Sequence, residues 1–406
     1  MTSELATDRR DVGVDETVLE GLAATFNAYV ADGRLPGWMV TVWRGGRRAW
    51  TGRGGYARRA SGEPVNEDTL WRIYSMTKPI TALLVMGLVD EGLLSLDDEV
   101  ARWVPELGAA TVFVGGTPEE PVTRPSGAPV SVRHLLSHTS GLTYGFTFRH
   151  PVDAMYRAKG HLFGSSGKGL SESVGDWCSM PLVFDPGTKF TYSVAFDVLG
   201  HLVERVTDRP LDAALRERVL DPLGLSDTDW WCPPEKRARL ADLELAPLLA
   251  SWSEYRIGEQ ATRWPRMLGA GGGLVSSAAD FERVMALMLG RGELDGVRLV
   301  APETFDLMVT NQLPDGGLLE DLAQDGYAEE GYAGCGFGLG QCVVVDAARA
   351  APLSVGTYRW GGAASTHYFV DPREDLAVAF YTQLLPTGTY PIFAQLVEGV
   401  YRSLGG

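Results

Sequence analysis

Strand-like segments lie near both ends of this 406-residue chain, and a mostly helical stretch, residues 131–249, separates them. Residues 38–44 and 47–56 flank Gly45-Gly46, a pair that supplies the positive φ angles of a two-residue β-hairpin. The strand-like segments of the C-terminal part are residues 336–345, 358–361, 367–371 and 376–383. No crossover helix is predicted between these consecutive strands, which favours antiparallel pairing. The pattern therefore predicts one antiparallel sheet built from both termini, flanked by helices, with a mainly helical lobe inserted.

From the length of the chain we predict that this mixed α+β architecture is divided into two domains. A single hydrophobic core usually stops growing at about 250–300 residues, and this chain is longer. We predict a discontinuous α/β sandwich domain from residues 1–107 and 266–406, and a mainly helical domain from residues 108–265, with the active site at their interface. Helices are expected at residues 18–32, 75–92, 278–290 and 392–404, and loops at residues 117–129, 160–169 and 315–334.

Charge and composition exclude several classes of protein. The formal net charge is −16 at pH 7 and the sequence pI is near 4.9, so the chain repels nucleic-acid phosphates and anionic lipid. We expect no nucleic-acid partner and no membrane attachment, since no segment reaches the roughly 18 apolar residues of a membrane span. A polar N-terminus and four scattered cysteines predict a cytoplasmic protein with reduced thiols.

Ser75-Met-Thr-Lys78 opens the apolar helix predicted at residues 75–92. Residues three apart share one face of a helix, so the Lys78 amine can reach the Ser75 hydroxyl. A hydroxyl becomes a good nucleophile when a base accepts its proton, and a lysine whose pKa is lowered by burial can be that base. Backbone N–H groups at the helix N-terminus would stabilise a developing oxyanion. The tetrad also fits a capping serine followed by a solvated lysine, so spacing alone leaves both interpretations open.

Further motifs make the chain resemble a known superfamily over residues 21–404. The motifs are Ser75-Met-Thr-Lys78, Val132-Arg-His-Leu-Leu-Ser-His-Thr-Ser-Gly-Leu142, Phe184-Asp-Pro-Gly-Thr-Lys-Phe-Thr-Tyr192-Ser193, Gly271-Gly-Gly-Leu-Val-Ser-Ser-Ala-Ala-Asp-Phe281 and Gly336-Phe-Gly-Leu-Gly340. In this order and spacing they are similar to those of class C β-lactamases, penicillin-binding proteins and family VIII carboxylesterases. The resemblance implies a β-lactamase/transpeptidase-like fold and a serine hydrolase that forms an acyl-enzyme on Ser75.

The resemblance also assigns roles to other residues. Tyr192 corresponds to the tyrosine of the family's Tyr-x-Asn motif, which implies that it shares proton transfer with Lys78. The backbone N–H groups of Ser75 and Ala363 form the implied oxyanion hole. From the residues alone, Tyr192 would be interpreted as a buried aromatic side chain with a satisfied hydroxyl.

Two departures from the family's motifs bear on the substrate. Val194 stands where the second motif usually has asparagine, and Trp360-Gly361-Gly362 stands where β-lactamases usually have Lys-Thr-Gly. Both changes remove polar recognition of an anionic, amide-bearing substrate, and Trp-Gly-Gly is similar to family VIII carboxylesterases. We predict substrate contacts from these four residues, with His367 as a further contact or auxiliary base. The glycines also fit a twisted strand end, and His367 also fits a polar strand residue.

The predicted function is hydrolysis of short-to-medium-chain carboxylic esters, which are small-molecule substrates, without a metal ion or organic cofactor. The same acyl-enzyme would serve a β-lactamase, an amidase, a D-amino peptidase or an acyltransferase. A binding module without turnover is the alternative from another class, and intact Ser75, Lys78 and Tyr192 argue against it. Aromatic residues of the middle segment, Tyr144 and Phe146 among them, fit either a lobe core or an acyl pocket. The sequence leaves the oligomeric state open.

Overall fold

The computed structural model describes residues 13–163, 167–249, 261–323 and 331–405. Its centre is an eight-stranded sheet in the order β11-β12-β13-β14-β15-β1-β2-β3, and neighbouring strands are antiparallel throughout. The strands are β1 (Gly37–Arg44), β2 (Arg47–Arg58), β3 (Glu63–Pro64), β11 (Cys335–Phe337), β12 (Cys342–Val344), β13 (Tyr358–Gly362), β14 (Thr366–Asp371) and β15 (Leu376–Tyr381). Because β1 pairs with β15, both ends of the chain share one sheet, and the predicted fold class is confirmed.

The predicted hairpin between β1 and β2 is present. Gly45 and Gly46 have φ angles of 62° and 71°, values that residues with a Cβ atom rarely adopt. The two glycines thus let the chain reverse in two residues, and β1 is left free to pair with β15 on its other edge.

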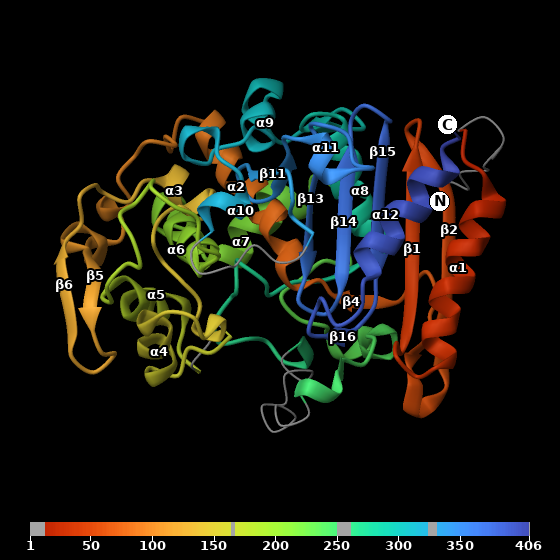
Figure 1. Ribbon diagram of the computed structural model, residues 1–406, viewed down its shortest axis with the longest axis horizontal. Coiled ribbons are helices and arrows are strands. Elements are labelled where there is room, and N and C mark those ends of the chain that lie inside the picture. The colour runs from red at the N-terminus through yellow and green to blue at the C-terminus, as the bar shows by residue number, and fades with distance from the viewer. Residues whose placement is uncertain (1–12, 164–166, 250–260, 324–330, 406) are drawn as a thin grey trace.

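Helices cover both faces of the sheet (Figure 1). On one face α1 (Glu16–Ala31) packs beside α12 (Ile392–Ser403), and Phe26 of α1 contacts the rings of Trp38 and Phe380. On the opposite face lies α8 (Ala278–Leu289), whose Phe281 contacts Tyr368 of β14. Each helix buries an apolar stripe against the sheet, and this burial supplies most of the stabilisation of such a layered fold.

The central helix α2 (Thr77–Asp90) is buried on nearly every side. A 3₁₀ turn, Tyr74–Met76, precedes it, and Pro79 lies in its first turn, where the missing N–H costs no hydrogen bond. α2 contacts the helix α6 (Ala195–Thr207) from the helical part of the chain. A helix so enclosed holds the residues at its N-terminus in fixed positions.

The remaining elements complete the helical part and the sheet edges. The helices are α3 (Val132–Leu136), α4 (Pro151–Ala158), α5 (Leu170–Cys178), α7 (Leu211–Leu215), α9 (Pro302–Met308), α10 (Leu319–Leu322) and α11 (Ala347–Ala350). Two-stranded pairs are β4 (Leu70–Arg72) with β8 (Val275–Ser277), β7 (Glu244–Leu245) with β16 (Leu384–Leu385), and β9 (Glu293–Leu294) with β10 (Val297–Arg298). The division into domains at residues 107/108 and 265/266 stays a prediction.

Three predictions of local structure need correction. The loop expected at residues 117–129 contains a strand, β6 (Pro121–Pro125), which pairs with β5 (Thr111–Gly116). The single strand expected at residues 336–345 is the pair β11 and β12, because the chain reverses at Gly340, whose φ is 102°. The loop expected at residues 315–334 includes α10, and residues 324–330 lie outside the described part. The loop at residues 160–169 lies partly outside it as well.

None of the helices in the described part of the chain is long and apolar enough to cross a membrane. The cysteines are buried free thiols, at positions Cys178, Cys232, Cys335 and Cys342.

Candidate active site

Ser75 lies in the 3₁₀ turn that leads into α2. The preceding residue, Tyr74, has a φ of 43°, a left-handed conformation that costs a residue with a side chain roughly 1–3 kcal/mol. Two hydrogen bonds fix this turn: the Ile73 N–H donates to the Leu274 carbonyl at 3.1 Å, and the Leu274 N–H donates to the Thr77 hydroxyl at 3.2 Å. Ser75 is partly exposed, so the turn presents its hydroxyl to solvent.

Two side chains donate hydrogen bonds to the Ser75 hydroxyl. The Lys78 amine lies 3.3 Å from Ser75 Oγ, and the Tyr192 hydroxyl lies 2.6 Å from the same atom. The Lys78 nitrogen also lies 4.4 Å from the centre of the Tyr192 ring. The structure therefore brings together the three residues that the motifs single out, although Tyr192 is 117 residues from Ser75 in the chain.

Lys78 is fully buried, with an exposed fraction of 0%. Its amine donates to the Gly271 carbonyl at 2.7 Å and to the Tyr144 hydroxyl at 3.4 Å. Burial lowers the pKa of Lys78 to about 7, and the nearby Asp197 carboxylate partly opposes this decrease. A lysine that is neutral just above pH 7 can accept a proton from Ser75, directly or through Tyr192.

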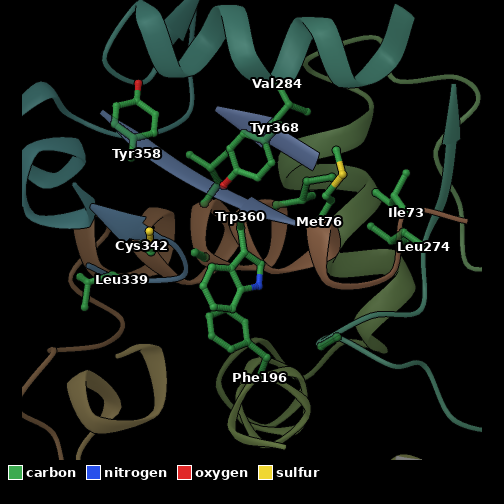
Figure 2. Close-up of a cluster of buried hydrophobic side chains, with 14 of the residues drawn as sticks. Ile73, Met76, Phe196, Leu274, Val284, Leu339, Cys342, Tyr358, Trp360 and Tyr368 are labelled. Carbon is green, nitrogen blue, oxygen red and sulfur yellow. The ribbon is translucent and has the colours of Figure 1, made fainter. Parts of the chain in front are cut away.

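Trp360 of β13 contacts Tyr192. Its indole N–H donates to the Tyr192 hydroxyl at 3.4 Å, and the rings of Tyr192, Tyr332 and Phe337 lie within 5.2–5.4 Å of its ring. Figure 2 shows Trp360 within a cluster of buried side chains that also includes Met76 of the Ser75 turn. The surroundings of Tyr192 on this side are thus aromatic and dry.

The two glycines after Trp360 are explained by close packing. A Cβ atom on Gly362 would lie 2.4 Å from the Ile73 carbonyl oxygen, so the end of β13 runs directly against the segment before Ser75. A Cβ atom on Gly361 would lie 2.8 Å from Nδ1 of His367. Both contacts account for glycine without a substrate. The roles of the Ser75 and Ala363 N–H groups as oxyanion donors stay predictions.

His367 and Val194 do not join the group around Ser75. Gly361 pairs with His367 and Trp360 pairs with Tyr368, so the His367 side chain lies on the sheet face opposite to Trp360. There it contacts Phe393 of α12, and burial, with Arg359 nearby, lowers its pKa to about 3. The Val194 side chain, only 1% exposed, belongs to the apolar core. The predicted substrate contacts of these two residues find no support in this placement.

Two residues of the site were not predicted as such. Asp197 lies in the first turn of α6, is 4% exposed and accepts a hydrogen bond from the Gly271 N–H at 3.0 Å. Burial raises its pKa to about 6, while the Gly271 bond and Lys78 act in the opposite direction. An acidic residue in the first helical turn usually interacts with the helix dipole, so its position in the sequence does not point to a buried site for Asp197. Gly271 belongs to the Gly-Gly-Gly motif at residues 271–273, which does not by itself indicate a contact with Lys78.

Comparisons with known proteins identify the family and the fold of the chain. The Beta-lactamase family matches residues 22–396 of the chain. Protein Rv1367c of Mycobacterium tuberculosis is 35% identical over 91% of this chain and 90% of its own length, and Esterase EstB of Burkholderia gladioli is 34% identical over 94% of each. Among solved structures, that of EstCE1, described as a hydrolase with promiscuous acyltransferase activity, superposes with a TM-score of 0.77 at 26% identity, covering 95% of this chain and 99% of the other.

The matched family spans nearly the whole of the described sheet and the segments that carry Ser75, Lys78 and Tyr192. The match to EstB covers 94% of this chain. The chain therefore belongs to the Beta-lactamase family and is an enzyme of the β-lactamase-like serine hydrolase superfamily.

Proposed function

We propose that this enzyme hydrolyses carboxylic esters through an acyl-enzyme on Ser75. The observation that carries the proposal is the convergence of the Lys78 amine and the Tyr192 hydroxyl on Ser75 Oγ, at 3.3 Å and 2.6 Å. A serine flanked by two groups that can exchange protons with it is the arrangement that nucleophilic catalysis requires. The relative named as an esterase, EstB, supports the choice of an ester as the bond that is broken.

In the first half-reaction Ser75 Oγ attacks the ester carbonyl carbon and loses its proton to the Tyr192–Lys78 pair. The carbonyl oxygen becomes an oxyanion, for which the N–H groups of Ser75 and Ala363 are the proposed donors. Tyr192 then protonates the leaving alcohol as the carbon–oxygen bond breaks. In the second half-reaction water attacks the acyl carbon and gives its proton to the same pair. The bond from that carbon to Ser75 Oγ then breaks, the pair returns the proton to Oγ, and the carboxylic acid leaves.

The neighbourhood of Ser75 favours an uncharged, apolar substrate. Trp360 places an indole against Tyr192 in the position where the resemblance would put a cation for a β-lactam carboxylate. From Tyr192 a row of rings leads outward: Tyr144 at 5.2 Å, then Phe146 at 4.7 Å, then Phe163 at 5.8 Å. Phe163 is 40% exposed, so the row reaches the surface. Such a surface suits short-to-medium acyl chains or a hydrophobic alcohol part.

Acyl transfer to an alcohol is a second candidate function. EstCE1, a structure with a TM-score of 0.77 to this chain, is described as a hydrolase with promiscuous acyltransferase activity. The acyl-enzyme on Ser75 would be the same, and only the acceptor that replaces the leaving alcohol would differ. An apolar row of rings at the site would favour binding of an organic alcohol over water.

The test compares wild-type enzyme with Ser75→Ala on p-nitrophenyl esters from acetate to octanoate, with nitrocefin as a β-lactam substrate in parallel. Fast release of p-nitrophenol that vanishes in Ser75→Ala, with slow nitrocefin cleavage, supports the proposal. Nitrocefin cleaved faster than every ester would overturn the choice of ester. Activity that survives in Ser75→Ala would overturn Ser75 as nucleophile. Adding a short-chain alcohol and measuring the new ester separates transfer from hydrolysis.

A further inference from the structure

The backbone of Gly271 lies between a buried basic side chain, Lys78, and a buried acidic side chain, Asp197. Its carbonyl accepts a hydrogen bond from the Lys78 amine at 2.7 Å, and its N–H donates to Asp197 Oδ1 at 3.0 Å. One peptide segment therefore connects the lysine of α2 to a carboxyl group of α6. Both side chains are shielded from water, because Lys78 is 0% exposed and Asp197 is 4% exposed.

Three polar atoms surround Gly271 at close range. A Cβ atom on this residue would lie 3.2 Å from Asp197 Oδ2, 3.2 Å from the Tyr144 hydroxyl and 3.5 Å from the Lys78 nitrogen. A side chain at residue 271 would crowd these three groups, and glycine leaves them room. In a site shielded from water, a nearby carboxylate stabilises the lysine ammonium more than it would at the surface, and Asp197 raises the pKa of Lys78 in this way.

The start of α6 and the segment before it place Asp197 and Tyr192 near Lys78. Tyr192 lies just before the helix and donates to Ser75, while Asp197 lies in its first turn and accepts from Gly271. The Asp197 N–H donates in turn to the Val194 carbonyl, so the segment between the two residues is fixed by its own hydrogen bonds. The segment that holds Tyr192 against Ser75 therefore also holds Asp197 against Gly271.

We propose that Asp197 is a positioning residue that holds the Gly271 carbonyl against Lys78 and sets the pH at which Lys78 becomes the neutral base. This rests on the proposed function, in which Lys78 accepts a proton that originates on Ser75. Asp197 contacts neither Ser75 nor, in the proposed mechanism, the ester, so it acts through Lys78.

The titratable groups that face Lys78 come from three segments. Asp197 comes from α6, Tyr192 from the segment before α6, and His138 and Tyr144 from the segment after α3. Burial holds the pKa of His138 well below its ordinary value and that of Tyr144 well above it, so both are uncharged near neutral pH. Asp197 is the carboxylate among these groups. Its attraction for the ammonium raises the pKa of Lys78, against the effect of burial.

The sign of the expected effect follows from this interaction. Asp197→Asn keeps an oxygen that can accept from the Gly271 N–H but removes the charge. Without the carboxylate the Lys78 ammonium loses its stabilising partner, so Lys78 should deprotonate at a pH lower by about one unit. The acid limb of the pH dependence of kcat/KM should shift in the same direction by the same amount, a change that a purely structural defect would not produce.

The chain is well suited to a direct measurement because it contains five lysines, at positions 78, 159, 168, 189 and 236. Protein made with ε-¹³C-lysine should give five NMR signals, and the Lys78 signal is identified by its absence in Lys78→Arg. Titration of wild type and Asp197→Asn from pH 5.5 to 10 then reads the protonation of Lys78 without any substrate. An ester hydrolase assigned in error would fail in the p-nitrophenyl assay and leave this titration intact, so the two proposals fail separately.

Asp280→Asn is the matched control. Asp280 is 5% exposed, and its carboxyl group accepts from the Asp227 N–H and from Thr228, as Asp197 accepts from Gly271, but it lies on α8, outside the group around Ser75. We expect the Lys78 titration to be unchanged in Asp280→Asn. A Lys78 titration that coincides in wild type and Asp197→Asn would overturn the proposal. Should Asp197→Asn not fold, Asp197→Glu takes its place: it keeps the charge, and a Lys78 titration below that of wild type would overturn the proposal equally.

Discussion

Two buried basic side chains, Lys78 and Arg359, have pKa values that are shifted in opposite directions. Lys78 is surrounded by hydroxyl groups and a carbonyl, and burial lowers its pKa to about 7. Arg359 is 4% exposed and lies between the rings of Tyr332 and Phe393, whose centres are 4.5 Å and 4.3 Å from its guanidinium carbon. Burial acts to lower the pKa of Arg359, but Cys342, Tyr332 and Cys335 outweigh it and the pKa is raised.

Burial of a basic side chain can serve proton transfer in one place and packing in another. A guanidinium spreads its charge and can lie flat against aromatic rings, so Arg359 stays charged and serves as a structural element. An ammonium concentrates its charge and depends on water, so a dry site lowers the pKa of Lys78, and its neutral amine can act as a base just above pH 7. The residue type, more than the depth of burial, decides which of the two results.

The largest expected effect is the loss of catalysis in Lys78→Met. Ester turnover should fall by about 10²–10⁴-fold, the usual contribution of a general base, because Ser75 loses its proton acceptor. The unfolding free energy at pH 7 should be at least as high as that of wild type, since a buried amine is replaced by an apolar chain of similar length. Stopped assays with p-nitrophenyl butyrate and urea denaturation measure the two quantities. Unchanged turnover would contradict the role of Lys78.

Arg359→Ala should show the reverse pattern. We expect the unfolding free energy to fall by about 2–4 kcal/mol, because two ring contacts are lost and a cavity remains between Tyr332 and Phe393. The titration of Lys78 should stay as in wild type. Urea denaturation measures the loss, with Arg102→Ala, a change of an exposed residue, as control. A stability equal to that of the control variant would mean that the guanidinium adds nothing to the packing.

The two cations should also differ in their response to pH. As pH falls below about 7 Lys78 becomes protonated, so kcat/KM should decrease about tenfold by pH 6, while Arg359 keeps its charge throughout. Measurement of kcat/KM from pH 5.5 to 9 at constant ionic strength tests for this decrease at acid pH. A rate that stays level across this range would remove Lys78 from the proton-transfer step.

Stability provides an independent check on the same titration. The pKa of Lys78 is lower in the folded protein than its ordinary value of 10.5, so between pH 7 and 10.5 the unfolded chain binds more protons. The contribution of Lys78 to the unfolding free energy should therefore rise with pH in this window, and Lys78→Met should lack this rise. Thermal denaturation of both proteins from pH 7 to 9.5 gives the difference. Parallel curves would show that Lys78 is protonated in the folded state.

The smallest expected effect belongs to Trp360→Phe. This change keeps an aromatic ring beside Tyr192 but removes the indole N–H that donates to the Tyr192 hydroxyl. Loss of one such bond should lower kcat about two- to tenfold, and the smaller buried ring should lower the unfolding free energy by about 1 kcal/mol. Trp360 and Arg359 are neighbours on β13, so their side chains lie on opposite faces of the sheet. Trp360 contacts Tyr192 on one face, and Arg359 contacts Phe393 on the other. A loss of stability as large as that of Arg359→Ala would mean that Trp360 too is mainly structural.

The sequence predicted those features that depend on local spacing. Ser75 and Lys78 lie one helical turn apart, and the Gly45-Gly46 turn follows from the φ angles that glycine permits. Contacts between distant segments were beyond such patterns. Asp197 and Gly271 are 74 residues apart, and only the packing of α6 against α2 brings the carboxyl group to Lys78. Tyr192 could be placed near Ser75 only through a resemblance to a family.

Local spacing was also an insufficient guide for His367, within the single strand pair β13 and β14. Its position a few residues after Trp360 suggested a shared site, but strand register decides which face a side chain occupies, and one residue is enough to reverse it. The strand at residues 121–125 was missed because Pro121 and Pro125 are typical of loops. Both prolines lie at the ends of this edge strand, where the missing N–H is tolerated.

The pairing of β1 with β15 has a consequence for the time at which the enzyme becomes active. The Thr382 hydroxyl donates to the Gly37 carbonyl across a separation of 345 residues. A ribosome needs on the order of tens of seconds to make that much chain, and throughout this time the N-terminal hairpin has an unpaired edge. The sheet that supports Trp360 is complete only when the last strand has emerged. A nascent chain can therefore carry the Ser75 motif for most of its synthesis and still lack the sheet that places Trp360 beside Tyr192.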